Sequence, residues 1–137
     1  MILVDTNVWS ELLRPAPAPA VIAWEIAEAN GLYMSTVVIG EFLSGVAMMP
    51  EGKRKSDFLK RYEPIIRLYA DRIVPFDLDA ARHYADILAA QERAGRNPGT
   101  ADTQIAATAR ARGMALATRN VKHFEGLGLD LIDPWQA

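Results

Sequence analysis

The sequence predicts an α/β fold in which a parallel five-stranded sheet is sandwiched between helices. Five short apolar runs of strand length alternate along the chain with longer stretches of helical periodicity. Such alternation is typical of βα units, in which parallel strands pair and helices cover both faces of the sheet. With 137 residues, 50% of them apolar and 23% charged, the chain also has the composition of one globular domain covering residues 1–137.

The N-terminal part contains two expected strands and two expected helices. Residues 2–4 are an apolar run at the chain start and predict a buried strand. Residues 6–13 predict a helix that ends before Pro15, and residues 19–29 predict a second helix. Residues 32–35 follow an Asn-Gly pair and predict the second strand.

The middle of the chain predicts a pair of helices followed by a strand. The first helix covers residues 37–48 and ends before Pro50. The second covers residues 54–70 and is expected to kink at Pro64, because proline lacks a backbone donor and crowds the preceding turn. Residues 72–75 predict the third strand, which is short.

The C-terminal part completes the alternation. Residues 78–94 and 100–112 predict helices, each closed by the glycine that follows it, since glycine readily adopts the left-handed conformation at a helix end. Residues 114–118 and 129–132 predict the last two strands. In sheets of this class ligands bind beyond the carboxyl ends of the strands, so functional side chains are expected at that edge.

Four polar residues follow the predicted strands or lie near helix starts. Asp5 ends the first strand, and Asn120 follows the fourth. Glu41 lies on the helix after the second strand, and Asp102 lies in the first turn of the 100–112 helix. Asp5 and Asn120 are expected at the same sheet edge, whereas the place of Asp102 depends on where residues 95–99 deliver its helix.

Each of these residues also has a purely structural interpretation. Asp5 is suited to cap the helix that begins near Thr6, and Asp102 is suited to interact with a helix dipole. Asn120 is a common turn residue. Glu41 is harder to explain in this way, because it lies in an apolar segment where an ionised carboxylate needs a partner such as a metal ion or an arginine.

Three carboxylates from distant segments would form a hard oxygen site. The chain has no cysteine and only two histidines, which excludes a disulfide framework, a thiolate zinc site and a cysteine nucleophile. Oxygen ligands without cysteine or histidine favour Mg²⁺ or Mn²⁺ over zinc. The reaction suited to such a site is metal-assisted attack of water on a phosphodiester.

Four segments of the chain resemble the motifs of the PIN-domain nucleases. They are residues 1–8, 35–45, 101–109 and 117–124, in the family's order and at similar spacing. The resemblance is strongest to the VapC-like bacterial toxins, and within them to the FitB-like subgroup. That subgroup also carries features similar to Arg14-Pro15 and Pro134-Trp135 of this chain.

The resemblance implies a parallel five-stranded α/β sandwich and Mg²⁺- or Mn²⁺-dependent cleavage of RNA. It implies three catalytic, metal-binding carboxylates: Asp5, Glu41 and Asp102. It also implies supporting hydroxyls on Thr6 and Thr118. Many family members have aspartate at the position of Asn120 or of His123, and this chain has neither carboxylate. Asn120 can still offer a carbonyl oxygen to a metal or a water at the catalytic site, but the number of ions stays open.

The resemblance also implies partners. Relatives pair with a small antitoxin that binds DNA through one end and blocks the nuclease groove with the other, often through an arginine. An arginine suits an acidic groove because guanidinium and carboxylate pair in a bidentate manner. Relatives form homodimers, and pairs of dimers occur in the antitoxin complexes.

Basic residues offer candidate contacts to RNA. The chain has 15 Lys+Arg against 17 Asp+Glu, so no strong overall field draws it to nucleic acid. A local basic cluster, which is either a phosphate-contacting rim or a solvated helix face, consists of Lys53, Arg54, Lys55, Lys60 and Arg61. Arg119 lies beside Asn120 and is a second candidate for contacting RNA.

Two other functions are weighed against the nuclease. A catalytically inactive PIN-like protein would use its groove only to bind an antitoxin-like partner, and Asn120 favours that alternative. A phosphatase of the haloacid dehalogenase type needs a second aspartate two residues after Asp5, but position 7 is asparagine. No apolar run approaches the ~18 residues of a membrane span, and the N-terminus lacks a basic leader, so a cytoplasmic protein without a membrane segment is expected.

Overall fold

The computed structural model describes residues 1–97 and 99–137 of the chain. Its sheet has five strands, all parallel, in the order β3-β2-β1-β4-β5. The strands are β1 (Ile2–Val4), β2 (Leu32–Ser35), β3 (Ile73–Val74), β4 (Ala115–Ala117) and β5 (Leu131–Ile132). All lie where the sequence predicts strands, and the fold class is confirmed. The two edge strands are shorter than predicted, each with two residues.

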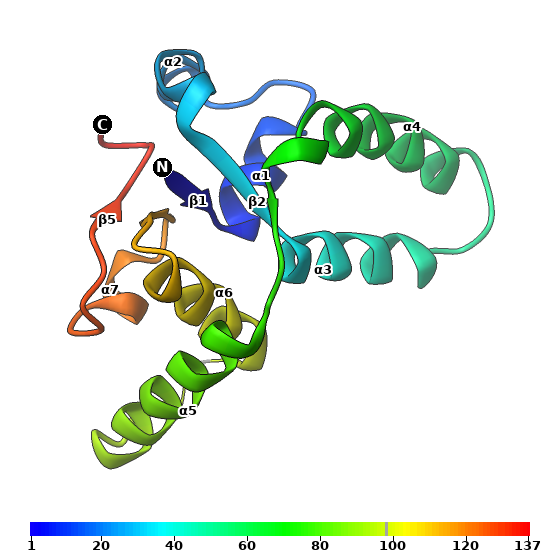
Figure 1. Ribbon diagram of the computed structural model, residues 1–137. Coiled ribbons are helices and arrows are strands. Elements are labelled where there is room, and N and C mark those ends of the chain that lie inside the picture. Colours follow the sequence, from blue (N-terminus) through cyan, green and yellow to red (C-terminus); the bar gives the residue numbers. More distant parts are fainter. Residues whose placement is uncertain (98) are drawn as a thin grey trace.

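Helices connect the strands. The chain runs through α1 (Thr6–Leu12), α2 (Pro19–Glu28), α3 (Thr36–Ala47), α4 (Lys53–Leu68), α5 (Leu78–Arg93), α6 (Thr100–Ala111) and α7 (Val121–Phe124). Figure 1 shows α3 and α4 as a helical hairpin beside the sheet, with α5, α6 and α7 grouped on the other side. The helices predicted from the sequence are all present, and α4 continues through Pro64. The four-residue α7 and the 3₁₀ turns at Ala29–Gly31 and Ala70–Arg72 are not predicted, because such short segments carry no periodic pattern.

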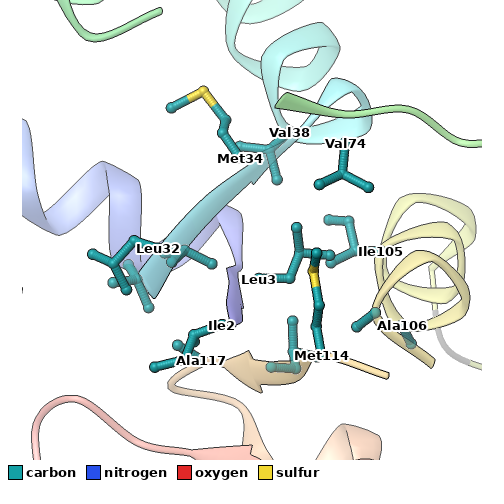
Figure 2. Close-up of a cluster of buried hydrophobic side chains, with 14 of the residues drawn as sticks. Ile2, Leu3, Leu32, Met34, Val38, Val74, Ile105, Ala106, Met114 and Ala117 are labelled. Carbon is teal, nitrogen blue, oxygen red and sulfur yellow. The ribbon is translucent and has the colours of Figure 1, made fainter. Parts of the chain in front are cut away.

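The core lies on both faces of the central strand. Leu3 and Val4 of β1 are completely buried, as expected for a strand covered on two sides. Figure 2 shows Leu3 among side chains from neighbouring strands and from the α3 and α6 helices, including Val38 and Ile105. This packing fixes β1, so the residue that follows it has a defined position at the sheet edge.

Two helix ends are set by glycine, as predicted. Gly95 follows α5 with φ of 70°, and Gly113 follows α6 with φ of 63°. In this left-handed region a residue with a Cβ is strained. Gly113 turns the chain from α6 into β4, which pairs with β1 and brings residue 118 beside residue 5.

The carboxyl ends of β1 and β4 meet at one point. The Asp5 amide donates to the Ala117 carbonyl at 2.9 Å. Asp5 and Thr118, the residues that directly follow β1 and β4, are therefore neighbours at the carboxyl edge of the sheet. Among the described residues, no helix is both long and apolar enough to cross a membrane.

Candidate active site

A groove of about 760 Å³ opens at the carboxyl edge of the sheet. Its lining includes the four polar residues singled out in the sequence: Asp5, Glu41, Asp102 and Asn120. They come from the end of β1, from α3, from the first turn of α6 and from the turn after β4. The structure therefore brings these four residues together, including Asp102, whose place the sequence leaves open.

Asp5 is the most buried acid of the groove, with 2% of its surface exposed. One carboxylate oxygen accepts from the Thr6 amide at 2.7 Å, so Asp5 does cap α1. The other oxygen accepts from the Thr118 hydroxyl at 2.8 Å and from the Asn7 side chain at 3.3 Å. Asp5 thus both caps α1 and lines the groove, and its hydrogen bonds hold the carboxylate in one orientation.

The charge of Asp5 is unfavourable in the protein alone. Burial raises the pKa of Asp5 above its ordinary value, and the negative charges of Asp102 and Glu41 raise it further. The hydrogen bonds from Thr118 and Thr6 lower it and only partly compensate. Burial and like charge together make this carboxylate a strong attractor for a cation.

Glu41 finds its partner in a hydroxyl. The Thr6 side chain donates to the Glu41 Oε1 atom at 2.6 Å, which links the start of α1 to α3. In the parts of the chain that the structure describes, Glu41 forms no ion pair, so the arginine considered from the sequence is not present. Glu41 is half-buried and faces the groove, where its second oxygen is available.

Asp102 and Asn120 line the same groove as Asp5 and Glu41. Asp102 is half-buried in the first turn of α6, where it also complements the helix dipole. Asn120 is exposed, and its backbone amide donates to the Thr118 hydroxyl at 3.1 Å. Its side chain does not cap α7, so the amide oxygen of Asn120 is not committed to that helix.

The acidic side chains suit a divalent cation by chemistry, but they do not form a ready cage. Within residues 1–97 and 99–137, no three acidic, histidine or cysteine side chains stand close enough together to hold an ion as they are placed. A bound cation would nevertheless offset the repulsion between the acids and the cost of ionising the buried Asp5, whose pKa is raised. Their carboxylate oxygens are also hard ligands, of the chemical type that hard divalent cations bind.

One wall of the groove is apolar and comes from the helical hairpin. Phe42 and Val46 of α3, together with Met49 just after that helix, line the groove with Phe58 and Tyr62 of α4. The Phe42 and Tyr62 rings pack with their centroids 4.3 Å apart. The groove thus places an acidic end beside a broad apolar surface.

The basic cluster divides in the structure. Lys53 and Arg54 line a second cavity, which shares Phe58 and Arg61 with the groove. Lys55 lines neither cavity, and its ammonium group lies 2.6 Å from the Glu51 carboxylate. The Lys55 side chain is only 17% exposed, so its ammonium group is held by Glu51 and is not free in solvent.

Two polar residues of the groove are missed by the sequence argument. Asn7 donates to Thr118 at 3.3 Å and accepts from the Arg119 amide at 3.1 Å, so it connects the ends of β1 and β4. Glu11 is buried and accepts from the Ala18 amide at 2.8 Å and from Arg14 at 3.1 Å. The only signal for Asn7 is its place two residues after Asp5, and Glu11 resembles an ordinary polar helix residue.

Glu11 gives a pH-dependent prediction. The hydrogen bond from the Ala18 amide lowers the pKa of Glu11, and Arg14 lowers it further, so the ionised side chain stabilises the fold. A depressed pKa contributes stability above the unfolded value of about 4.3, and this stability is lost as the pH falls through the lower folded value. Glu11→Gln is expected to melt below wild type at pH 7, with the difference closing in acid. Melting curves across pH test this, with the exposed Glu92→Gln as control, and a difference independent of pH would contradict it.

Known proteins are similar to the chain along its whole length. The family model of the PIN domain matches residues 2–127. The VapC ribonuclease Y4jK of Sinorhizobium fredii is 46% identical over 99% of both chains. The toxin FitB of Neisseria gonorrhoeae is 39% identical, over 98% of this chain and 99% of its own. The structure of FitAB bound to an IR36 DNA fragment matches with a TM-score of 0.89 at 38% identity, over 98% of this chain and 96% of that one.

The fold, the acidic groove and these similarities agree with one another. A parallel five-stranded sheet carries carboxylates at its carboxyl edge, and the family model covers the segments that supply all four polar residues of the groove. The chain is a member of the PIN-domain family, among the VapC and FitB toxins.

Proposed function

We propose that this protein is an endoribonuclease that acts as the toxin of a toxin–antitoxin pair and hydrolyses phosphodiester bonds of RNA. The observation that carries the proposal is the groove in which Asp5, Glu41 and Asp102 converge from three distant segments. A concentration of carboxylates with one buried member is costly to the fold, so it calls for a function that uses it. Similarity to a VapC ribonuclease and to the toxin FitB supports the same activity.

Asp5, Glu41 and Asp102 would hold the Mg²⁺ or Mn²⁺ ion or ions. A divalent cation in such a site supplies an activated water and neutralises charge at the phosphate. The protein's own part is to orient the ligands. Thr118 fixes one oxygen of Asp5 by a hydrogen bond of 2.8 Å, and Thr6 fixes one oxygen of Glu41 at 2.6 Å.

Asn120 has a more limited role in this proposal. It lies exposed at the groove, where its amide oxygen would orient a water or complete a ligand set without adding charge. Because amide oxygens bind divalent cations less strongly than carboxylates, we expect Asn120 to matter less than the three acids.

The partner in this proposal is a cognate antitoxin that itself binds DNA. The FitAB assembly, solved on a DNA fragment, contains a relative that is 38% identical to this chain. The half-buried members of the apolar wall, Phe42, Met49 and Phe58, give such a partner a surface to cover, and the carboxylates would accept a cationic side chain from it. An RNA-cleaving toxin of this kind would act in the cytoplasm.

Asn120 also favours one alternative, an inactive PIN-like protein that only binds a partner. Divalent-cation binding distinguishes the two functions. The nuclease must bind Mn²⁺ or Mg²⁺ in the groove, whereas the inactive protein has no need to do so.

The purified protein should be incubated with a mixed pool of RNA in Mn²⁺, in Mg²⁺ and in EDTA. The nuclease predicts cleavage with either metal and none with EDTA, together with a melting temperature that rises when Mn²⁺ is added, because an ion that binds only the folded state stabilises it. Absence of both cleavage and metal stabilisation would overturn the nuclease in favour of the inactive partner-binding protein.

A further inference from the structure

Arg119 and Trp135 form a pair at the rim of the groove. The Arg119 guanidinium lies 4.7 Å from the centre of the Trp135 ring, and both residues line the groove beside Asp5 and Asp102. Arg119 lies in the turn after β4, whereas Trp135 lies in the turn after β5, at positions 119 and 135 of the chain. Two segments far apart in sequence thus meet to place one cation in the lining of the groove that holds the acidic residues.

The three cations of the groove lining differ in how they are engaged. Arg14 is paired with Glu11 at 3.1 Å, and Arg61 donates to the Leu13 carbonyl at 3.4 Å. Across the residues that the structure describes, the Arg119 side chain makes no hydrogen bond and no ion pair. Contact with the face of an indole ring holds a guanidinium without using its N–H donors.

The backbone of Arg119 is anchored at the same place. Its amide donates to the Asn7 side chain at 3.1 Å, and its neighbour Thr118 is bonded to Asp5 at 2.8 Å. The Cα of Arg119 is therefore fixed relative to Asp5, while Trp135 limits where the side chain reaches. An arginine restrained in this way loses less freedom when it binds an anion.

We propose that Arg119 binds a backbone phosphate of the RNA next to the acidic cluster, and that Trp135 is a positioning residue that holds the guanidinium for this contact. The inference rests on the proposed nuclease function. A divalent cation would neutralise charge only where it binds, and a planar cation at the rim can pair with a neighbouring phosphate in a bidentate manner. Arg119 is the groove arginine whose donors are available for it.

The first test measures RNA binding without cleavage. Arg119→Ala and Arg119→Lys are made in the Asp5→Asn background, and binding of a fluorophore-labelled single-stranded RNA is followed by anisotropy over a range of salt concentrations. Arg82→Ala, an exposed arginine of α5 outside the groove, is the matched control.

Arg119→Ala is expected to weaken binding about tenfold and to lower the slope of log K against log salt by about 0.7, the contribution of one phosphate contact. Arg119→Lys keeps the charge and the salt slope but loses the bidentate geometry. Its affinity for RNA should therefore lie between that of the parent and that of Arg119→Ala. Arg82→Ala should bind as its parent does. An Arg119→Ala protein with the same affinity and salt slope as Arg82→Ala would overturn the inference.

The second test separates positioning from a merely structural role for Trp135. Trp135→Leu is expected to weaken RNA binding about threefold when Arg119 is present and to have no further effect in the Arg119→Ala protein. Trp135→Phe keeps an aromatic face and should fall closer to wild type. An equal loss with and without Arg119 would refute the positioning role, because the effect would then come from the fold.

Cleavage by the wild-type protein separates failure of the Arg119 contact from failure of the proposed nuclease function. If the wild-type protein cuts RNA while Arg119→Ala matches the control, the inference fails and the nuclease stands. If the wild-type protein neither cuts nor binds RNA, the proposed function fails, and the role of Arg119 fails with it.

Discussion

Asp5→Asn is expected to abolish RNA cleavage, with a loss of about a thousandfold or more, equivalent to ~4 kcal/mol of activation free energy. Asp5 is the most buried acid of the groove; burial raises its pKa, and the charges of Asp102 and Glu41 raise it further. Asparagine keeps the shape and the cap on Thr6 but removes the charge that would bind a divalent cation. The measurement is the initial rate of RNA cleavage in Mn²⁺.

The fold should survive this change, and this separates a chemical defect from an unfolded protein. An acid whose folded pKa is raised destabilises the fold once the pH exceeds its unfolded value of about 3.9, because the native state must then give up a proton it favours. Asparagine cannot accept the hydrogen bonds that the second Asp5 oxygen receives from Thr118 and Asn7, which offsets part of this gain. Without divalent metal at neutral pH, Asp5→Asn should therefore melt close to the wild-type temperature. The exposed Asp86→Asn is the control and should cut normally. A folded Asp5→Asn protein with the wild-type rate would rule out the proposed site.

Thr6→Val is expected to lower cleavage about ten- to a hundredfold, the range found when a residue that orients a metal ligand is lost. The Thr6 hydroxyl donates to Glu41 at 2.6 Å, and valine has the same shape but no donor. Glu41 would then be free to turn away from Asp5, so more divalent metal should be needed for half-maximal activity. Rates measured across a Mn²⁺ titration give both quantities.

Thr6→Ser is the matched variant for this prediction. Serine restores the hydroxyl, so its rate and metal requirement should return towards wild type, although it lacks the methyl group of threonine. A merely structural role for Thr6 would instead make the two variants differ in melting temperature and not in metal requirement. Equal cleavage by Thr6→Val and wild type would show that Glu41 needs no support from Thr6.

Local chemistry in the sequence was enough to predict the elements of the fold. The apolar run at residues 2–4 is strand β1, and the glycines at 95 and 113 end α5 and α6 with positive φ. These features depend on side-chain burial and on backbone freedom within a few residues, so they can be read from the chain directly. Asp5 and Asn120 follow from the same logic, because the carboxyl ends of parallel strands share one edge.

The tertiary structure decided which groups act on one another. The bond from Thr6 to Glu41 spans 35 positions, and the bond from Thr118 to Asp5 spans 113, so no local pattern announces either of them. Folding also separates Lys55, paired with Glu51, from Lys53 at the second cavity, although both belong to one basic run.

The sequence by itself determined an α/β chain with acids at the carboxyl edge of a parallel sheet. Only the tertiary structure decided that Asp102 lines the same groove as Asp5 and that Trp135 lies against Arg119. The physical reason is that helix and strand signals arise from neighbouring residues. The geometry of a site depends instead on how distant segments pack, and that is set by the whole core at once.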